Sequence, residues 1–346
     1  MVQRIGFLTF GHWQAVPGSR VRTARDALVQ TVELAQAAEE LGLDGGFVRV
    51  HHFARQLASP FPLLSAMAAR TSRLELGTGV IDMRYENPLY MAEEAAATDL
   101  LSDGRLQLGI SRGSPETALR GSEAFGYVPT TSDADLAREK TALFLAALEG
   151  ASLVDADPRM TGVAGRLALQ PQSPGLRERI WWGSGTRSTA VWTAQQGLNL
   201  MSSTLLSEDT GVPFDELQAE QIALYRAAFA DAGWGREPRV SVSRSVLPVT
   251  TAMDRHYFGD RTGEDSVGLL EGVRSRFGKN YAGEPDQLAE ELAKDAAVRD
   301  ADTLLLTVPN MLGADYCARL LETVARDIAP ALGWTPAPAR GPLAEG

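Results

Sequence analysis

One short motif, LGISRG, places an arginine and a glycine directly after an apolar run. If that run is a strand, the Arg112 guanidinium extends from the strand end, beside Gly113, where bare backbone lets a ligand approach closely. This combination of residues is typical of a phosphate site. The alternative is an arginine at the rim that pairs with a nearby acid such as Glu116 and binds no ligand.

A second motif, GSGTRS, ends another apolar run and begins a helical pattern. Gly183 and Gly185 close the run, and Thr186 and Ser188 add hydroxyls where the free N–H groups of a helix start favour an anion. The dinucleotide pattern G-x-G-x-x-G is incomplete, because Ser188 takes its last place. Either hydroxyl alone is equally well explained as a plain helix cap. Together the two motifs predict one phosphate held between the fourth and fifth strands.

Acidic side chains are nearly absent from the expected strand ends, where Asp82 is the only clear carboxylate. A glycoside hydrolase needs two carboxyl groups beside the scissile bond. A catalytic metal needs several histidine or acidic ligands that converge. Neither set is evident, so we expect no resident metal. The net charge of −11 argues against nucleic-acid binding, which requires clustered basic residues.

The chain has a single cysteine, Cys317, which excludes an intrachain disulfide and is typical of a reducing, cytoplasmic environment. No apolar run reaches 18 residues, so we expect no membrane association. The first residues, MVQRIGFLTF, lack the pattern of a secretion signal. We therefore expect a cytoplasmic location.

Strand-like and helix-like patterns alternate along the whole chain, and this alternation must position the motifs. The expected strands are 4–10, 45–50, 73–81, 105–111, 179–184, 198–203, 239–249 and 302–308. The expected helices are 24–41, 61–70, 89–102, 134–149, 187–196, 214–232, 286–297 and 314–332. Eight β-α units predict an α/β fold, a single-domain (β/α)8 TIM barrel. A doubly wound Rossmann sheet is the alternative, but it rarely has eight strands without a domain break.

Two segments fit no β-α unit and are expected to be insertions after strands 4 and 7. The first is 150–178, and the second, 251–284, is expected to leave the C-terminal rim and act as an active-site lid. Both insertions are expected to line the substrate pocket. We expect the barrel domain to span 1–334 and a flexible tail to span 335–346.

Several longer motifs resemble those of the bacterial luciferase-like, flavin-dependent monooxygenases, and the resemblance covers nearly the whole length. They are HHF after the second strand, NPLYMAEEAAATDLLSDGRLQLGISRG through the fourth, GSGTRSTAVWTAQQGLNLMSS and GEPDQLAEEL. The resemblance implies an oxidoreductase with FMN as cofactor. It also implies that Arg112 binds the FMN phosphate, together with Thr186, Ser188 and the backbone near Gly185. Thr78, Gly79 and Val80 would lie against the isoalloxazine ring, with a non-prolyl cis peptide at Thr78–Gly79.

The resemblance suggests catalytic roles as well. His51 aligns with the histidine that luciferases use as a base, and Arg244 aligns with an arginine that sulfonate-oxidising relatives place in the substrate pocket. Successive strand side chains point to opposite faces, so we expect His51 at the barrel mouth and His52 directed away. A bulge would reverse this assignment, and purely structural roles for both are the alternative. His12 in the first loop is a third candidate, and Ser111 replaces the reactive cysteine of luciferases.

The function implied is a monooxygenase that uses reduced FMN and O2 on a small organic substrate. A separate flavin reductase would supply the reduced FMN. One alternative on the same fold is a deazaflavin-dependent oxidoreductase, in which Arg187 and Arg244 would bind the longer acidic tail of that coenzyme. A further alternative is a non-catalytic flavin-binding protein. A homodimer is expected, with apolar helices 61–70 and 89–102 at its interface.

Overall fold

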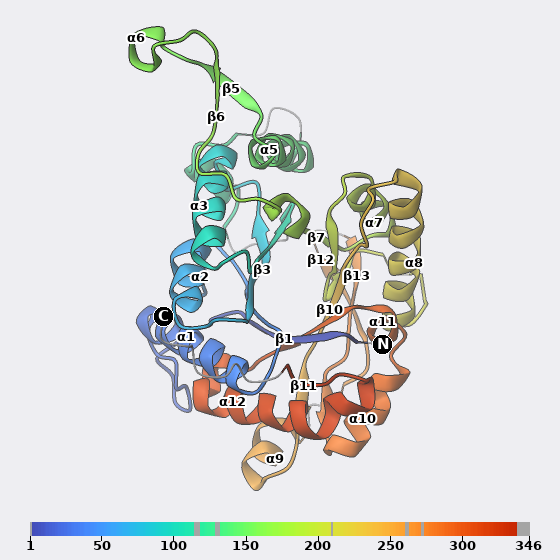
Figure 1. Ribbon diagram of the computed structural model, residues 1–346. Helices are drawn as coiled ribbons and strands as arrows, with labels where there is room; N and C mark the ends of the chain where they lie inside the picture. Colours follow the sequence, from blue (N-terminus) through green and yellow to red (C-terminus); the bar gives the residue numbers. More distant parts are fainter. Residues whose placement is uncertain are drawn as a thin grey trace.

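Eight parallel strands close into a barrel, and helices cover its outside (Figure 1). This computed structural model describes residues 2–113, 118–128, 132–208, 210–259, 263–270 and 273–337. The barrel strands, in their order around the barrel, are β1 (Arg4–Thr9), β2 (Gly45–Val48), β3 (Glu75–Asp82), β4 (Leu106–Ser111), β7 (Ile180–Ser184), β8 (Asn199–Ser202), β10 (Val240–Arg244) and β15 (Thr303–Thr307). The predicted (β/α)8 barrel is confirmed, and all eight expected strands take part in it.

The covering helices follow the strands along the chain. They are α1 (Ala24–Glu40), α2 (Pro60–Ala68), α3 (Pro88–Leu101), α5 (Asp133–Leu148), α7 (Arg187–Gln195), α8 (Phe214–Ala232), α10 (Pro285–Lys294), α11 (Ala296–Asp300) and α12 (Ala314–Thr323). α1 begins at a capping box, in which Thr23 and Asp26 each accept a hydrogen bond from the other's backbone N–H. Such caps fix where the helices begin. The apolar faces of the helices pack on the barrel.

The inside of the barrel is filled at one end and open at the other. Leu8, Phe47, Trp181, Met201 and Leu305 form a cluster inside it. Near the N-terminal ends of the strands, the bidentate ion pair of Arg239 with Glu75 has N–O distances of 2.8 and 3.0 Å, and the guanidinium lies 5.0 Å from the Trp181 ring. Space for a ligand is therefore left only toward the C-terminal ends.

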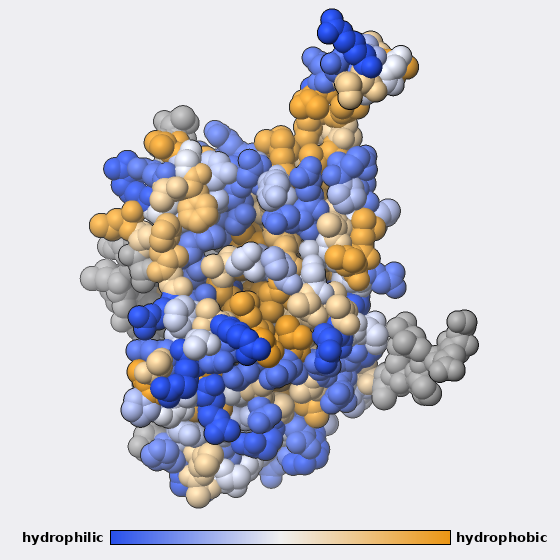
Figure 2. Space-filling model, turned by 90° about the vertical axis from the view of Figure 1, so that its left-hand side faces the viewer, coloured by the Kyte–Doolittle hydropathy of each residue, from blue (hydrophilic) through white to orange (hydrophobic). Residues whose placement is uncertain are grey.

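The first insertion forms an arm that projects from the barrel (Figure 1). It consists of β5 (Ser152–Asp155), α6 (Pro158–Thr161) and β6 (Arg166–Ala168), with β5 and β6 antiparallel. Figure 2 shows the arm projecting above the rest of the molecule, with apolar side chains along its length. The exposed apolar side chains of the arm are Val154, Met160, Val163 and Leu167.

The second insertion contains α9 (Ala252–Phe258), β12 (Ser266–Leu270), β13 (Val273–Phe277) and β14 (Tyr281–Gly283). β13 pairs with β9 (Leu205–Leu206), a short strand that follows barrel strand β8, so this hairpin lies beside the C-terminal rim. β14 pairs instead with β11 (Val246–Pro248). Within the described part of the chain, no helix is both long and apolar enough to span a membrane.

Candidate active site at the barrel mouth

A cavity of about 310 Å³ lies at the C-terminal ends of the barrel strands, and residues after or on all eight strands line it. Strands β4 and β7 are neighbours, with Ile110 paired to Trp182, so the segments that follow them meet at the rim. As a result, Arg112 and Thr186, which are 74 positions apart in the sequence, line the same cavity. The structure thus brings together the two motifs that suggested an anion site.

One side of the cavity is polar and suited to an anion. Gly185 and Thr189 line it beside Thr186, and Ser203 and Ser207 add hydroxyls from the segment after β8. This segment is held in place by backbone bonds, because Ser203 N–H donates to the Ser184 carbonyl and Ser207 N–H to the Gly185 carbonyl, at 2.9 and 3.0 Å. Hydroxyls and a guanidinium on one wall form a set of donors for phosphate oxygens.

Arg112 supplies the positive charge of this polar side. Its side chain is exposed to the cavity, and no carboxylate among the described residues lies within ion-pairing distance of it. Glu116, the acid that the sequence offered as a partner, lies outside the described residues. The neighbouring Gly113 has φ of +92°, and a side chain there would collide with Asp82 and Arg84. Gly113 therefore allows the tight turn after Arg112.

A second arginine of the cavity wall, Arg84, is held by two carboxylates. It forms a bidentate pair with Asp82, with Nη2–Oδ2 at 2.6 Å, and its Nη1 lies 3.0 Å from Asp133 Oδ2. Burial opposes the charged form of Arg84, but the bonds to both acids outweigh burial and raise its pKa. The Asp82 carboxylate noticed in the sequence is thus the partner of Arg84.

Lys140 is buried next to Arg84, and Glu86 nearby in the chain is half-buried. Lys140 Nζ donates to the Arg84 carbonyl at 2.7 Å. Burial lowers the pKa of Lys140 to about 8, while burial and then the Glu94 carboxylate raise the pKa of Glu86 to about 7. Neither residue lines the cavity.

The start of α7 carries an acidic neighbour that the sequence did not suggest. Thr186 is the N-cap and accepts from Thr189 N–H at 3.2 Å. Glu208 accepts the Arg187 N–H at 3.1 Å, which shows that the helix start favours an anion but also that a carboxylate already lies there. Ser188 is exposed, 3.2 Å from the Thr186 hydroxyl, and lies outside the cavity wall.

The other part of the wall is apolar and contains the expected ring-binding segment. Gly79 and Val80 line the cavity with Leu8, Met201 and Leu305. A non-prolyl cis peptide is present here, but between Gly79 and Val80.

The prediction of a cis peptide at Thr78–Gly79 is therefore wrong by one residue. Thr78 is still in regular register with Leu108 of β4, and its hydroxyl donates to the Gly109 carbonyl at 2.7 Å. The register changes only between Thr78 and Ile81. Thr78 is fully buried behind the wall and is not one of its lining residues.

The two adjacent histidines have different surroundings, although strand alternation is not the reason. β2 ends at Val48, so the expected strand 45–50 is too long, and the histidines lie in the loop that follows. The His51 Nε2 atom lies 3.1 Å from the Arg49 Nε, which donates to it. His52 stacks on Tyr85, with ring centroids 4.4 Å apart, and its Nε2 is 3.8 Å from a Glu86 carboxylate oxygen.

His12 lies near His51 at the rim. Its ring stacks on Phe10, with centroids 5.5 Å apart, and its backbone exchanges two hydrogen bonds with the Asn310 side chain. Burial and then the His51 charge lower the pKa of His12. Neither histidine is itself part of the cavity wall; Arg49 lines the cavity next to them.

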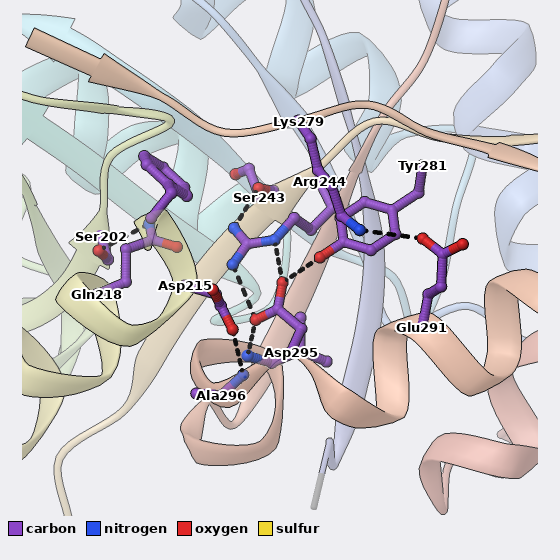
Figure 3. A network of polar contacts seen from close by, with 12 residues as sticks. Ser202, Asp215, Gln218, Ser243, Arg244, Lys279, Tyr281, Glu291, Asp295 and Ala296 are labelled. Atoms are coloured by element: carbon purple, nitrogen blue, oxygen red, sulfur yellow. Dashed lines mark hydrogen bonds and ion pairs between the residues drawn. The ribbon is translucent and has the colours of Figure 1, made fainter. Parts of the chain in front are cut away.

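Arg244 is placed away from the cavity, contrary to the expectation from the sequence. Ser241 and Ser243 of β10 line the cavity, so the alternating residue Arg244 points outward to the helix layer. There its Nε and Nη2 donate to the Asp295 carboxylate at 2.7 and 3.0 Å (Figure 3). Tyr281 also donates to Asp295, at 2.6 Å. Burial acts to raise the pKa of Asp295, but Arg244 outweighs it and the pKa is lowered.

The sequence missed several residues of the wall. Arg49 and Ser207 were not singled out, although Arg49 lies near the end of the predicted strand 45–50 and Ser207 comes shortly after LNLMSS. The expectation that the insertions line the pocket is wrong for 150–178, because the arm projects outward. Of the described part of 251–284, no residue lines the cavity either. Nor does any group of three or more His, Cys, Asp or Glu with metal-binding spacing occur among the described residues.

A model of the luciferase-like monooxygenase family matches residues 4–256, and the chain belongs to this family. YwcH of Bacillus subtilis (strain 168) is 41% identical over 98 residues, or 28% of this chain and 29% of the relative. Protein y4wF of Sinorhizobium fredii is 31% identical over 202 residues, or 57% and 56% of the two chains. The oxygenase component of flavin-dependent trigonelline monooxygenase from Acinetobacter baylyi is 34% identical over 109 residues, or 31% and 30%. Each match spans less than two thirds of the relative.

Solved structures share the fold over nearly the full chain. Monooxygenase RslO1 from Streptomyces bottropensis superposes with a TM-score of 0.72 at 19% identity, covering 95% of this chain and 99% of the other. The oxygenating constituent of 3,6-diketocamphane monooxygenase from Pseudomonas putida, in complex with FMN, gives 0.66 at 15% identity, covering 95% and 99%. Coenzyme F420-dependent tetrahydromethanopterin reductase from Methanopyrus kandleri gives 0.62 at 13%, covering 96% and 100%. The barrel is therefore common to proteins that use different cofactors.

Proposed function

We propose that this protein is an FMN-dependent monooxygenase that uses reduced FMN and O2 to oxidise a small organic substrate. The observation that carries this proposal is the division of one cavity into two sides. Arg112 and the hydroxyls around Thr186 form an anion side, and the Gly79–Val80 segment with its apolar neighbours forms a side for a flat ring. FMN combines these two chemical parts in one molecule.

The residues of the cavity fit an FMN phosphate and ring. A side chain at Gly185 would lie 3.2 Å from the Leu205 carbonyl oxygen, so glycine keeps this part of the wall thin and its backbone accessible. Gly183 faces Val80 in the same way, with an added Cβ 3.3 Å from that side chain. The apolar contacts of Leu8, Val80 and Met201 suit one face of a ring system.

One observation favours FMN over the deazaflavin coenzyme. The arginines expected to bind the longer acidic tail of that coenzyme are already engaged in ion pairs. Arg187 lies 3.4 Å from Glu208 and 3.0 Å from Glu220, and Arg244 is bonded to Asp295. A structural neighbour with this fold is described as a complex with FMN, although another is described as dependent on coenzyme F420.

When bound, reduced FMN would supply the electrons for activation of O2. The chain's own contribution is to hold the phosphate at Arg112 and to keep the ring side dry through its apolar wall. His51 accepts a hydrogen bond from Arg49 at Nε2, which assigns its proton to Nδ1. We assign His51 the role of holding a proton at the cavity rim, with His12 beside it.

We also propose that reduced FMN comes from a separate flavin reductase. A relative is named as the oxygenase component of a flavin-dependent monooxygenase, which supports this arrangement. A homodimer through α3 is proposed as well, because Tyr90, Leu100 and Leu101 of this helix are exposed. α2, in contrast, buries most of its apolar side chains within the chain.

The test is titration of the protein under nitrogen with reduced FMN, oxidised FMN and coenzyme F420, followed by mixing with O2. We expect reduced FMN to bind most tightly and Arg112→Ala to weaken its binding. We also expect the flavin reoxidation kinetics to change when a substrate is added. Tighter binding of coenzyme F420 would favour the deazaflavin alternative. Tight flavin binding without any effect on reoxidation across a broad substrate panel would favour a non-catalytic flavin-binding protein.

A further inference from the structure

Two serine side chains of barrel strand β10, Ser241 and Ser243, point into the cavity. They are separated by one residue, so they lie on the same face of the strand, and both line the cavity wall. β10 is four strands away from β3 in either direction around the eight-stranded barrel. The two serines therefore lie on the wall opposite Gly79–Val80, the segment proposed to contact the flavin ring.

Neither serine hydroxyl forms a hydrogen bond with another described residue. Ser241 is only 2% exposed, and Ser243 is half-buried. The residues in register with Ser241 are Met201 and Thr303, and the Thr303 hydroxyl is itself buried without a partner among the described residues. Ser243 is in register with the apolar Leu305. Because buried hydroxyls normally form hydrogen bonds, these two serines have bonds left to offer a molecule in the cavity.

The backbone of β10 holds both hydroxyls in fixed positions. The strand is paired with β8 on one side and with β15 on the other. The Arg244 guanidinium also donates to the Ser243 carbonyl, at 2.9 Å (Figure 3). Alternate residues of a strand are about 7 Å apart at Cα, a separation that lets one acceptor atom between the two hydroxyls contact both.

Around the two serines the cavity wall is apolar and uncharged. Leu305 of β15, Leu8 of β1 and Met201 of β8 line it. The hydroxyl of Ser202, on neighbouring β8, is already bonded to two buried glutamines of α8. The charged residues of the cavity wall all lie after β2, β3 or β4 or at the start of α5. The chemical complement of the β10 side is an uncharged molecule with an apolar body and one oxygen that accepts hydrogen bonds.

We infer that Ser241 and Ser243 determine substrate specificity, and that they bind an uncharged organic substrate through a carbonyl oxygen that accepts from both hydroxyls. This inference rests on the proposed function, because it takes FMN to fill the Gly79–Val80 side and the Arg112 side. A pure hydrocarbon would displace water from both hydroxyls and leave them unpaired, and an anionic group would meet no cation on this wall. A carbonyl oxygen has two lone pairs and no charge, so it avoids both penalties.

The experiment uses two pairs of probes that are matched in shape, acetophenone with α-methylstyrene and cyclohexanone with methylenecyclohexane. In each pair the hydrocarbon has C=CH2 in place of C=O and accepts no hydrogen bond. Dissociation constants are measured by calorimetry on the FMN-saturated protein and again on the protein without FMN. Wild type is expected to bind each ketone at least about tenfold more tightly than its hydrocarbon partner.

Ser241→Ala and Ser243→Ala are each expected to weaken ketone binding about three- to tenfold, without weakening hydrocarbon binding. The double variant should bind ketone and hydrocarbon within about twofold of each other. The matched control is Ser245→Ala, because Ser245 directly follows β10 but lies outside the cavity wall, so it should keep the wild-type preference. FMN affinity is expected to change less than about threefold in the double variant, in contrast to Arg112→Ala.

The inference is overturned if wild type binds ketone and hydrocarbon equally, if it binds none of the four probes, or if the double variant keeps the preference. It is also overturned if the double variant weakens FMN as strongly as Arg112→Ala does, because the serines would then bind the cofactor. Failure of wild type to bind FMN would contradict the proposed function instead. In that case the ketone preference measured without FMN still tests the role of the two serines.

Discussion

Arg112 and Arg244 both follow the pattern of an arginine at the end of a barrel strand, yet the structure gives them opposite surroundings. Arg112 is exposed to the cavity, and no carboxylate of the described residues pairs with it. Arg244 is only 3% exposed and is bonded to Asp295 outside the barrel wall. The first has the surroundings of a ligand-binding residue, and the second those of a structural one.

The difference follows from the side of the strand on which each residue lies. In β10, Ser241 and Ser243 face the cavity, and Arg244 shares the outward face with Val240 and Val242. Arg112 comes just after β4 ends at Ser111, in a turn where alternation no longer applies. A charge that faces the helix layer must be paired to be tolerated, whereas one at the mouth is hydrated until a ligand binds.

The largest expected effect is on the Arg244 side of the comparison. Arg244→Met should lower the free energy of unfolding by about 3–5 kcal/mol, because it leaves the Asp295 carboxylate buried without its cation. Denaturant unfolding followed by circular dichroism measures this. The double variant Arg244→Met with Asp295→Leu should recover most of the loss, since apolar groups replace both charges. A single variant as stable as wild type would contradict the structural role.

Arg112 should show the reverse pattern. Arg112→Ala should weaken FMN binding about 10- to 100-fold, the equivalent of about 1.5–3 kcal/mol for hydrogen bonds to a charged group. Its free energy of unfolding should change by only about 0.5 kcal/mol, because the side chain is exposed. Flavin fluorescence titration and denaturant unfolding of the same preparation measure the two quantities. Loss of stability without loss of affinity would reverse the assignment.

The pH dependence of stability separates the two arginines further. The pKa of Asp295 is lowered in the folded protein, so the carboxylate contributes stability above its unfolded pKa of about 4. That contribution is lost as the pH falls through the lower, folded value. Wild type should therefore lose stability at acidic pH more steeply than the double variant, while Arg112→Ala should follow wild type. Parallel curves for wild type and the double variant would contradict this.

The smallest expected effect concerns Glu208 at the start of α7. Glu208→Gln removes a carboxylate that accepts the Arg187 N–H, so the helix start should favour a phosphate more strongly. FMN binding should become about two- to fivefold tighter. Glu220→Gln is the control, because Glu220 also pairs with Arg187 but accepts from its side chain. Unchanged or weaker FMN binding by Glu208→Gln would place the phosphate away from this helix.

The order of elements could be predicted from the sequence because buried parallel strands are continuous apolar runs and each is followed by a helical pattern. The two halves of the anion side were predictable for the same reason, since residues after neighbouring strands must meet at the rim. Arg49 was harder to predict, because the run GGFVRV was expected to be strand up to residue 50, whereas the strand boundary at Val48 is set by pairing with β1.

The sequence by itself determined the barrel, its strand order along the chain and the candidate anion site at Arg112 and Thr186. Local patterns suffice for these features, because apolar periodicity and turn residues act over a few positions. Only the tertiary structure decided that Arg244 contacts Asp295, that the arm projects away from the cavity and that Arg49 lines the cavity. These outcomes depend on which face of a closed sheet is inside and on partners about 50 or more residues away, as for Arg244 and Asp295 at a separation of 51.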